Sequence, residues 1–339
     1  MVSHGALLVD MTNGGTTMEY AKQLATMWEG IEEFYAKVDR DESVSTKLPP
    51  MTTVMETGSQ TAKVGYASYD NGSLQFLETR RNRNTGELLP VEANEILGSD
   101  TVNALGEAFN AVTSAGKAAV RIAVAASTME AEVLDDVEAS AAAALMADEL
   151  LDDGSSFDES TEYPVCMSPH RLCRYSDKRA QGQNAEDGFS NSREVFGAHV
   201  DSTWVTIVPV AAVSGLEVLD ETEVKWYRPE LAAKRHFEES GSGSDDADLP
   251  WYSRYVVLMP GELLQLATRN EIPAAVHRVV ATQNAPSRLS APILFRCRPG
   301  VKMDVARYLG DSGGYPLLKQ CDGMTIEEIH AALQPTSFQ

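Results

Sequence analysis

The sequence is poor in positive charge and has no run of apolar residues long enough to cross a bilayer. Its 339 residues include 28 Lys and Arg against 50 Asp and Glu, which gives a net charge of −22. A surface this acidic repels phosphate backbones and offers anionic lipids no polybasic anchor. A membrane span needs about 20 mainly apolar residues in succession. We therefore expect neither nucleic acid nor a membrane as a partner.

The sequence also lacks a cysteine framework and a targeting segment. The chain has 4 cysteines, and none of them forms a CxxC pair. This scatter is typical of reduced core cysteines in an intracellular protein. The first residues, MVSHGALLVDMTNG, show neither the basic and apolar regions of a secretory signal nor the Arg-rich character of a transit peptide. We expect a cytoplasmic protein that acts as a monomer.

The apolar pattern divides the chain into three regions. Residues 1–155 are predicted to form a mixed, mainly helical supporting region, with helices over 18–38, 105–115 (broken or bent at Gly116) and 129–151. Residues 61–79 fit either a hairpin or a loop over a pocket. Residues 301–339 return to helix, and Thr325 with Glu328 forms a capping box before a helix over 326–333.

Residues 156–300 contain short β-rich runs separated by turns, which is typical of an antiparallel sandwich or barrel. An acidic, Gly/Ser-rich stretch at about 230–250 is predicted to be a loop insertion in this region. The β-rich runs are 171–175, 203–210, 215–219, 254–259, 262–267, 276–282 and 291–297.

His199 and Asp201 are predicted to form half of a metal site at the start of a buried strand. Side chains two positions apart on a strand point to the same face. His277 opens another β-type run and would supply the third ligand. Two histidines and one carboxylate are the set that selects non-haem Fe(II) for oxygen chemistry. A zinc enzyme also uses this set, but the HExxH motif is absent.

Arg288 and Ser290 are also two positions apart on a predicted strand. An arginine fork beside a hydroxyl is a good receptor for a carboxylate. The pair follows His277 by only 11 residues, so a neighbouring strand would return it beside the metal site.

These motifs in this order resemble the 2-oxoglutarate/Fe(II)-dependent dioxygenases, in their isopenicillin N synthase-like branch. The family pattern is HxD, then a distal His, then RxS. GLEVL at 215–219, PGELL at 260–264 and RLCRY at 171–175 are similar to further family segments. The resemblance covers about residues 165–300. The chain departs from the pattern at Cys173, where the family has Asn, and at Ser202 and Thr203, where an aromatic residue and Gly are usual.

The resemblance implies an α+β fold with a double-stranded β-helix core (jelly-roll, cupin-like), a helical N-terminal region and a C-terminal helix. It implies Fe(II) as metal and 2-oxoglutarate and O2 as co-substrates, with 2-oxoglutarate decarboxylated to succinate while a small-molecule substrate is oxidised. It assigns the metal to His199, Asp201 and His277, and 2-oxoglutarate to Arg288, Ser290 and Tyr175.

The resemblance leaves the reaction on the substrate open. Halogenating relatives replace the carboxylate by a small residue, so the presence of Asp201 disfavours halogenation. Hydroxylation, desaturation and oxidative ring closure remain, the last as in natural-product (kainoid-like) cyclases. An oxygenase that modifies protein side chains is disfavoured by the acidity of the chain, and a non-catalytic ligand-binding relative by its intact metal ligands.

Substrate contacts are predicted for aromatic and basic residues near the motifs, and the basic cluster at 80–83 would receive an anionic group. For each arginine alone, a surface or salt-bridged position is the simpler interpretation. The candidates are Trp204, Phe196, Tyr66, Arg80, Arg81, Arg83 and Arg296.

Overall fold

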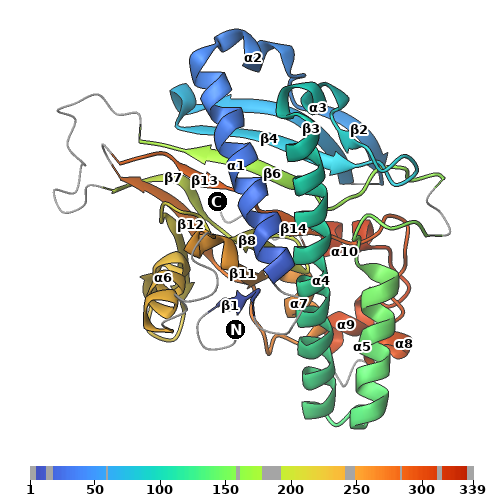
Figure 1. The fold of residues 1–339 in the computed structure, drawn as a ribbon. Helices are drawn as coiled ribbons and strands as arrows, with labels where there is room; N and C mark the ends of the chain where they lie inside the picture. Colours follow the sequence, from blue (N-terminus) through green and yellow to red (C-terminus); the bar gives the residue numbers. More distant parts are fainter. Residues whose placement is uncertain are drawn as a thin grey trace.

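Two antiparallel sheets face each other in the computed structural model, and helices cover the outer face of the larger sheet (Figure 1). The structure describes residues 5–12, 18–58, 60–157, 161–177, 192–240, 249–282, 285–310 and 315–333. No helix among these residues is long and apolar enough to cross a membrane.

The strands of the larger sheet come from both halves of the chain. In spatial order they are β1 (Leu7–Asp10), β11 (Tyr255–Pro260), β8 (Val205–Pro209), β14 (Ile293–Phe295), β6 (His170–Tyr175), β4 (Leu74–Arg81), β3 (Gln60–Tyr69) and β2 (Thr52–Thr57), with β13 (Arg288–Ser290) beside β6 and β5 (Leu88–Leu89) beside β4. The smaller sheet consists of β10 (Lys225–Tyr227), β9 (Leu216–Asp220), β12 (His277–Thr282) and β7 (Ser192–His199), in that order.

Most of the helices belong to the N-terminal and C-terminal regions of the chain, and one, α6, lies beside the smaller sheet (Figure 1). They are α1 (Met18–Arg40), α2 (Glu42–Lys47), α3 (Val91–Leu97), α4 (Ser99–Glu130), α5 (Asp136–Leu150), α6 (Pro229–Glu239), α7 (Glu262–Ala267), α8 (Val305–Leu309), α9 (Pro316–Cys321) and α10 (Ile326–Leu333).

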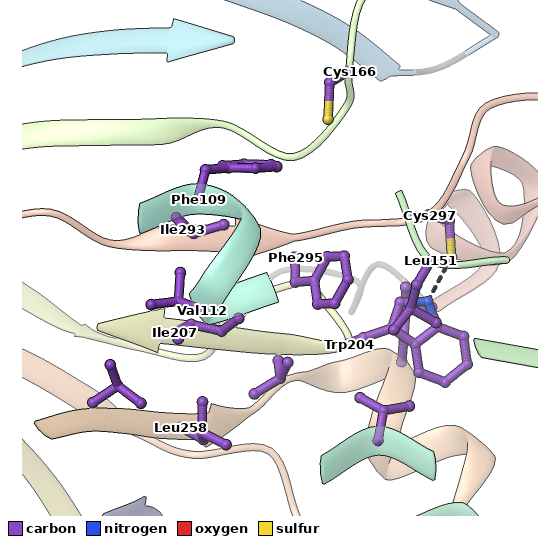
Figure 2. Close-up of a cluster of buried hydrophobic side chains, with 14 of the residues drawn as sticks. Phe109, Val112, Leu151, Cys166, Trp204, Ile207, Leu258, Ile293, Phe295 and Cys297 are labelled. Atoms are coloured by element: carbon purple, nitrogen blue, oxygen red, sulfur yellow. Dashed lines mark hydrogen bonds between the residues drawn. The ribbon is translucent and has the colours of Figure 1, made fainter. Parts of the chain in front are cut away.

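The side chains of the larger sheet alternate between a hydrophobic core on one face and a cavity on the other. On β8, Ile207 packs into the core under α4, as Figure 2 shows, whereas Thr206 and Val208 line a cavity on the opposite face. On β6, Leu172 is in the same core, and Cys173 lines the cavity. This is the period-two pattern of a strand with both faces covered. The cavity therefore lies between the two sheets.

The helix over residues 99–130 is unbroken at Gly116, contrary to the predicted break. A Cβ atom at Gly116 would lie 2.5 Å from the Ile207 Cδ1 atom and 3.2 Å from the Phe295 Cδ1 atom. The missing side chain lets α4 pack closely against β8 and β14, so the glycine serves helix–sheet contact. The alternating apolar residues 120–124, which left helix or strand open, belong to the same helix.

The N-terminal region contributes directly to the larger sheet. Residues 60–81 form the hairpin that was one of the two predicted alternatives, and its second strand pairs with β6 from Leu74↔Tyr175 to Thr79↔His170. β1 pairs with β11 at the other edge of the sheet. Residues 1–155 and 156–300 therefore share one sheet.

Two segments differ from the sequence prediction. Residues 262–267, predicted as a strand, form α7, because ELLQLA contains good helix formers and no β-branched residue. The predicted loop at 230–250 begins instead as α6, with Pro229 in its first turn and Glu230 and Ala233 buried. Residues 241–248 lie outside the described residues.

The predicted capping box of the C-terminal helix is confirmed. The Thr325 backbone N–H donates to the Glu328 carboxylate at 2.8 Å, and the Glu328 backbone N–H donates to the Thr325 hydroxyl at 3.3 Å. Each partner satisfies a backbone donor that the first turn of α10 would leave unpaired.

His170 is buried on the core face of β6, and we predict that it limits stability in acid. Burial, with Arg81 nearby, lowers the pKa of His170 to about 3. The unfolded chain binds this proton at about pH 6.5, so the folded state loses stability as the pH falls from there toward 3. Between pH 6.5 and 5 the loss is about 2 kcal/mol.

Denaturant unfolding at several pH values tests this prediction. The free energy of unfolding of a His170→Asn variant should fall less between pH 6.5 and 5 than that of the wild type. His236→Asn, which changes an exposed histidine of α6, is the matched control and should follow the wild type. Parallel curves for all three proteins would contradict the prediction.

Candidate metal and co-substrate site

The cavity between the sheets collects most of the residues that the sequence singled out. Its walls come from β4, β6, β8, β13 and β14 on one side and from β7, β9 and β12 on the other. It is lined by Leu74, Phe76, Arg171, Cys173, Tyr175, Phe196, His199, Asp201, Thr206, Val208, Leu216, Met259, His277, Val279, Arg288, Ser290, Pro292 and Leu294.

The two histidines are brought together by strand pairing. His277 on β12 is the register partner of His199 on β7, and their ring centroids are 4.3 Å apart. The sequence predicted that His199 and Asp201 share a strand, and this is wrong. β7 ends at His199, and the chain then passes toward the larger sheet. The three side chains nevertheless converge, with their ligand atoms within 4.8 Å of one another.

The segment that carries Asp201 is held by the start of α7. The Glu262 backbone N–H donates to the Asp201 carbonyl at 3.0 Å. On either side, the Gly261 N–H donates to the Trp204 carbonyl and the Leu263 N–H to the Thr203 carbonyl, both at 3.1 Å. A Cβ atom at Gly261 would lie 2.3 Å from the Thr203 carbonyl oxygen. Only glycine permits this approach.

The histidines present the nitrogen atoms that a metal would need. The Nδ1 atom of His199 faces the Gly197 carbonyl at 2.8 Å, and that of His277 faces the Ala275 carbonyl at 3.0 Å. A carbonyl can only accept, so each Nδ1 carries the hydrogen and each Nε2 has a free lone pair. These Nε2 atoms lie 3.6 and 3.5 Å from the carboxylate oxygens of Asp201.

The electrostatics keep Asp201 and His277 in the protonation states of metal ligands. Burial acts to raise the pKa of Asp201, but contacts with both histidines and with the Thr206 hydroxyl, at 2.5 Å, hold it well below its usual range. Burial lowers the pKa of His277, which favours the neutral imidazole. At His199, burial acts to lower the pKa, but contacts with Asp201 and the Gly197 carbonyl raise it, so this imidazole gives up its proton less readily. A carboxylate beside neutral imidazole is a suitable donor set for a divalent transition metal.

The same cavity is also lined by hydrogen-bond donors. Arg288 and Ser290 point to the same buried side of β13, as predicted, and Arg288 pairs in register with Tyr175. The Arg288 guanidinium lies 5.5 Å from the Tyr175 ring centroid. Burial, then the neighbouring Cys173, raises the pKa of Tyr175 well above its usual value, so the phenol keeps its hydrogen. Arginine, serine and tyrosine together can bind a carboxylate.

Glu230 forms a buried ion pair with Arg288, although no sequence pattern had singled out this glutamate. One Glu230 oxygen accepts from Arg288 Nε at 2.9 Å and Nη2 at 2.6 Å. The other accepts from the backbone N–H groups of Gly215 and Leu216 at 2.7 and 3.0 Å. Within the described residues, Arg288 Nη1 is left for a ligand. The glutamate was hidden because it belongs to the segment predicted as a loop.

A second, wider cavity adjoins the metal ligands. It shares Phe76, Arg171 and His199 with the first, and its other lining residues include Arg80 and Arg296. Phe196 lines the first cavity, with its ring 4.7 Å from the His199 ring. Three predicted substrate residues, Phe196, Arg80 and Arg296, therefore lie close to the metal ligands.

The structure places Trp204 and Tyr66 away from these two cavities. Trp204 is fully buried in the main core, where its indole N–H donates to the Cys297 sulfur at 2.7 Å (Figure 2). It comes after the bend that follows Asp201, so its position cannot be inferred from strand parity. Tyr66 on β3 packs against the same core.

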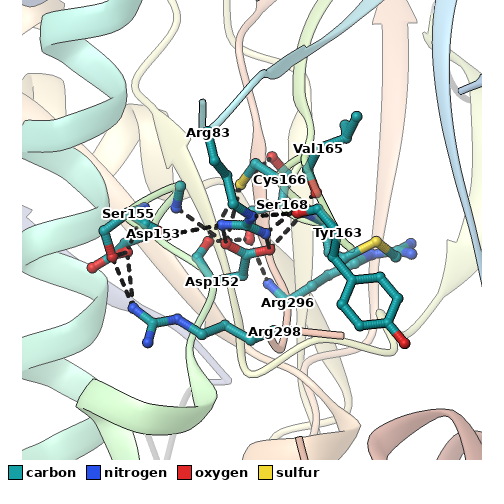
Figure 3. Close-up of polar contacts among 12 residues, drawn as sticks. Arg83, Asp152, Asp153, Ser155, Tyr163, Val165, Cys166, Ser168, Arg296 and Arg298 are labelled. Atoms are coloured by element: carbon teal, nitrogen blue, oxygen red, sulfur yellow. Dashed lines mark hydrogen bonds and ion pairs between the residues drawn. The ribbon is translucent and has the colours of Figure 1, made fainter. Parts of the chain in front are cut away.

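Arg81 and Arg83 are used in structural contacts. Arg81 donates to the Gly106 carbonyl and lies over the Phe109 ring of α4. Arg83 forms a fully buried ion pair with Asp152, as Figure 3 shows. Both correct the prediction of substrate contacts.

No family model and no curated protein sequence matches the chain. The fold is nevertheless similar to solved structures. A full-length protein of Neurospora crassa, in complex with alpha-KG and 5-formyluracil, has a TM-score of 0.53 at 16% identity, with 89% of this chain and 76% of that chain covered. The complex of the same fungal protein with alpha-KG and thymine has a TM-score of 0.51 at 14% identity, with 98% and 88% covered.

JOX2 in complex with 2OG, Fe and JA is also similar, with a TM-score of 0.50 at 12% identity over 89% of this chain and 70% of that chain. These neighbours are 2-oxoglutarate-dependent dioxygenases with a jelly-roll core. The likeness confirms the predicted α+β, double-stranded β-helix fold with a helical N-terminal region and a C-terminal helix. The isopenicillin N synthase-like branch stays a prediction.

We predict that Gly261→Ala weakens metal binding at the three ligands, although residue 261 is not itself a ligand. The added methyl group forces the segment that carries Asp201 to move, at a cost of roughly 1–3 kcal/mol. Titration with Co(II), followed by its absorption, should show an affinity at least tenfold lower than that of the wild type.

Gly197→Ala is the matched control, because its Cβ atom would meet only the Glu194 carboxylate, at an ordinary 3.5 Å. If Gly261→Ala bound Co(II) as tightly as Gly197→Ala, the proposed support of Asp201 by α7 would be wrong.

Proposed function

We propose that this chain is an Fe(II)- and 2-oxoglutarate-dependent oxygenase that oxidises a C–H bond of a small molecule. The supporting observation is that His199, Asp201 and His277 converge in a cavity that Arg288 and Ser290 also line. A metal site and a carboxylate receptor in one cavity suit a short dicarboxylate that reaches both.

The residues present fit the metal. Both free Nε2 atoms and the Asp201 carboxylate face one another, and three protein ligands would leave positions for a chelating co-substrate and O2. Bound Fe(II) would supply the activation of O2 that is coupled to the decarboxylation of 2-oxoglutarate to succinate. With the Asp201 carboxylate in place, the proposal covers hydroxylation, desaturation and ring closure.

The remaining cavity residues orient the co-substrate and exclude water. Arg288 Nη1, the Ser290 hydroxyl and the Tyr175 hydroxyl would donate to its distal carboxylate. Cys173 stands where the family has Asn, and burial raises the pKa of its thiol to about 11, so it stays a neutral thiol. The apolar residues Leu74 and Leu216 also line this cavity. A dry cavity protects reactive chemistry from hydrolysis.

Anaerobic titration of the protein with Fe(II) and 2-oxoglutarate tests this function. We expect a visible charge-transfer band that requires both components, and slow succinate release when O2 is admitted. A His277→Ala variant should show neither, because two ligands cannot replace three. A well-folded wild-type protein without the band would contradict the proposed function.

We predict that Arg288→Ala lowers both co-substrate affinity and stability. Loss of the buried ionic contact should weaken 2-oxoglutarate binding by roughly 2–5 kcal/mol. The change also leaves Glu230 as a buried charge without its cation, which costs about 3–5 kcal/mol of unfolding free energy. Calorimetric titration with 2-oxoglutarate and denaturant unfolding measure the two effects.

A double variant separates the two effects. In Arg288→Ala/Glu230→Gln the buried charge is gone, and the carbonyl of the introduced amide side chain still accepts from Gly215 and Leu216. Stability should therefore recover in part, while 2-oxoglutarate affinity stays low. Arg278→Ala, which removes a partly exposed arginine paired with Glu217, is the control and should keep normal affinity. Normal affinity in the double variant would refute the assignment of Arg288.

A further inference from the structure

Three arginines of the wider cavity lie close to a single carboxylate. Glu78 accepts from Arg80 at 2.8 Å and from Arg171 at 2.6 Å. Arg296 lines the same cavity and belongs to the same electrostatic neighbourhood, since both other arginines act on its pKa. Glu262, the other acid at this cavity, accepts a hydrogen bond from Ser202. The group around Glu78 therefore has excess positive charge in a chain of net charge −22.

The Arg80 guanidinium is used mainly in contacts within the protein. Besides Glu78, its guanidinium donates to the carbonyls of Lys63, Cys166 and Met167. This network fixes the Arg80 side chain, which is only 3% exposed, and connects β4 to β3 and to the segment before β6. Four hydrogen bonds use most of its five N–H donors, so Arg80 mainly supplies charge to the cavity.

Arg296 is held at its backbone and unpaired at its side chain. Its N–H donates to the Ser168 hydroxyl at 2.9 Å, and its carbonyl accepts from the Asp152 N–H at 2.9 Å. Its Nε atom is buried without a hydrogen-bond partner, and no ion pair with Arg296 is found in the described part of the chain. Figure 3 shows its side chain extending away from the Arg83–Asp152 ion pair.

The burial of Arg296 and the cations beside it favour the binding of an anion. Burial, then Arg80 and Arg171, lower the pKa of Arg296 to about 10, which still leaves it charged at neutral pH. Glu78 and Asp201 act on this pKa in the opposite direction, but neither forms an ion pair with Arg296. A desolvated cation beside two others is unfavourable unless an anion completes the group. Arg171 has only its Nε in a described bond, to Glu78, so its outer nitrogens are also available. It lies over the Phe76 ring, at 5.5 Å from the centroid.

We infer that Arg296, with Arg171 beside it, binds a carboxylate of the substrate, so that the substrate is a small organic acid. The inference rests on the proposed function and specifies the substrate class of that site. The anion would lie on the side of His199 where the two cavities meet, near the stacked rings of Phe76 and Tyr69. These rings suit an apolar carbon skeleton attached to the acid group.

The test compares acids with their neutral amides. The probes are phenylacetate, 3-phenylpropanoate and hexanoate, each paired with its primary amide. Binding is measured by ligand-observed NMR on the protein without metal, and by the change that each probe causes in the anaerobic Fe(II)/2-oxoglutarate band. For the wild type, at least one acid should bind tenfold or more tightly than its amide. Equal or undetectable binding in every pair would overturn the inference.

Three variants identify the residue responsible. Arg296→Met should abolish the preference for the acid, and Arg296→Lys should keep part of it. Arg298→Met is the matched control, because Arg298 comes two residues later and is bound to Asp153 and Ser155 instead. It should keep the full preference. Retention of the preference in a folded Arg296→Met protein would overturn the inference.

The two proposals fail in different ways. If Arg296→Met weakened 2-oxoglutarate itself and left acid binding unchanged, Arg296 would serve the co-substrate, and the inference would be wrong. If the wild type showed no Fe(II)/2-oxoglutarate band but still preferred acids in the metal-free NMR measurement, the proposed function would fail while the anion site remained.

Discussion

The candidate site depends on the pairing register of β12. His277 is in register with His199 on one side and with Val218 on the other, so its side chain is fixed toward the cavity from both neighbours. A shift of one residue would turn every side chain of the strand to the opposite face. The His277 imidazole would then leave the cavity, and Asp201 would lose one of its two histidine contacts. Fold and metal site are therefore specified by the same contacts.

Charge is distributed unevenly between the surface and the interior of this protein. The surface is strongly acidic, whereas several arginines are buried. Arg83 with Asp152, and Arg288 with Glu230, are pairs in which each buried cation has its own carboxylate. Breaking such a buried pair destabilises the folded protein, but the intact pair carries no net charge. Arg296 forms no ion pair within the part of the chain that the structure describes, and this is the property expected of a receptor for a ligand rather than of a structural ion pair.

The sequence singled out His277, Arg288 and Ser290 because short-range rules determine where these side chains point. Arg288 and Ser290 share a face by strand alternation, and His277 begins a strand that is recognisable from its β-branched residues. Glu230 could not be found in this way. It contacts Arg288 through a helix that precedes it by 58 residues, and no local pattern encodes such a contact. Trp204 was expected beside the substrate because it follows Asp201 closely in the sequence, but the chain bends after Asp201 and Trp204 is buried in the main core.

The basic cluster at 80–83 shows why substrate contacts are the hardest part to predict. In the sequence its three arginines are equivalent, and a shared role as an anion receptor was a reasonable expectation. In the fold, alternation along β4 turns Arg80 and Arg81 to opposite sides, and the strand ends before Arg83. Each side chain then meets a different partner, and Arg296, far away in the chain, is a cation at the cavity without an ion pair among the described residues. Local pattern gives the direction of a side chain, but only the packed structure shows whether its charge is already neutralised. The substrate class follows from this second property, which is why it emerges from the fold and not from the motifs.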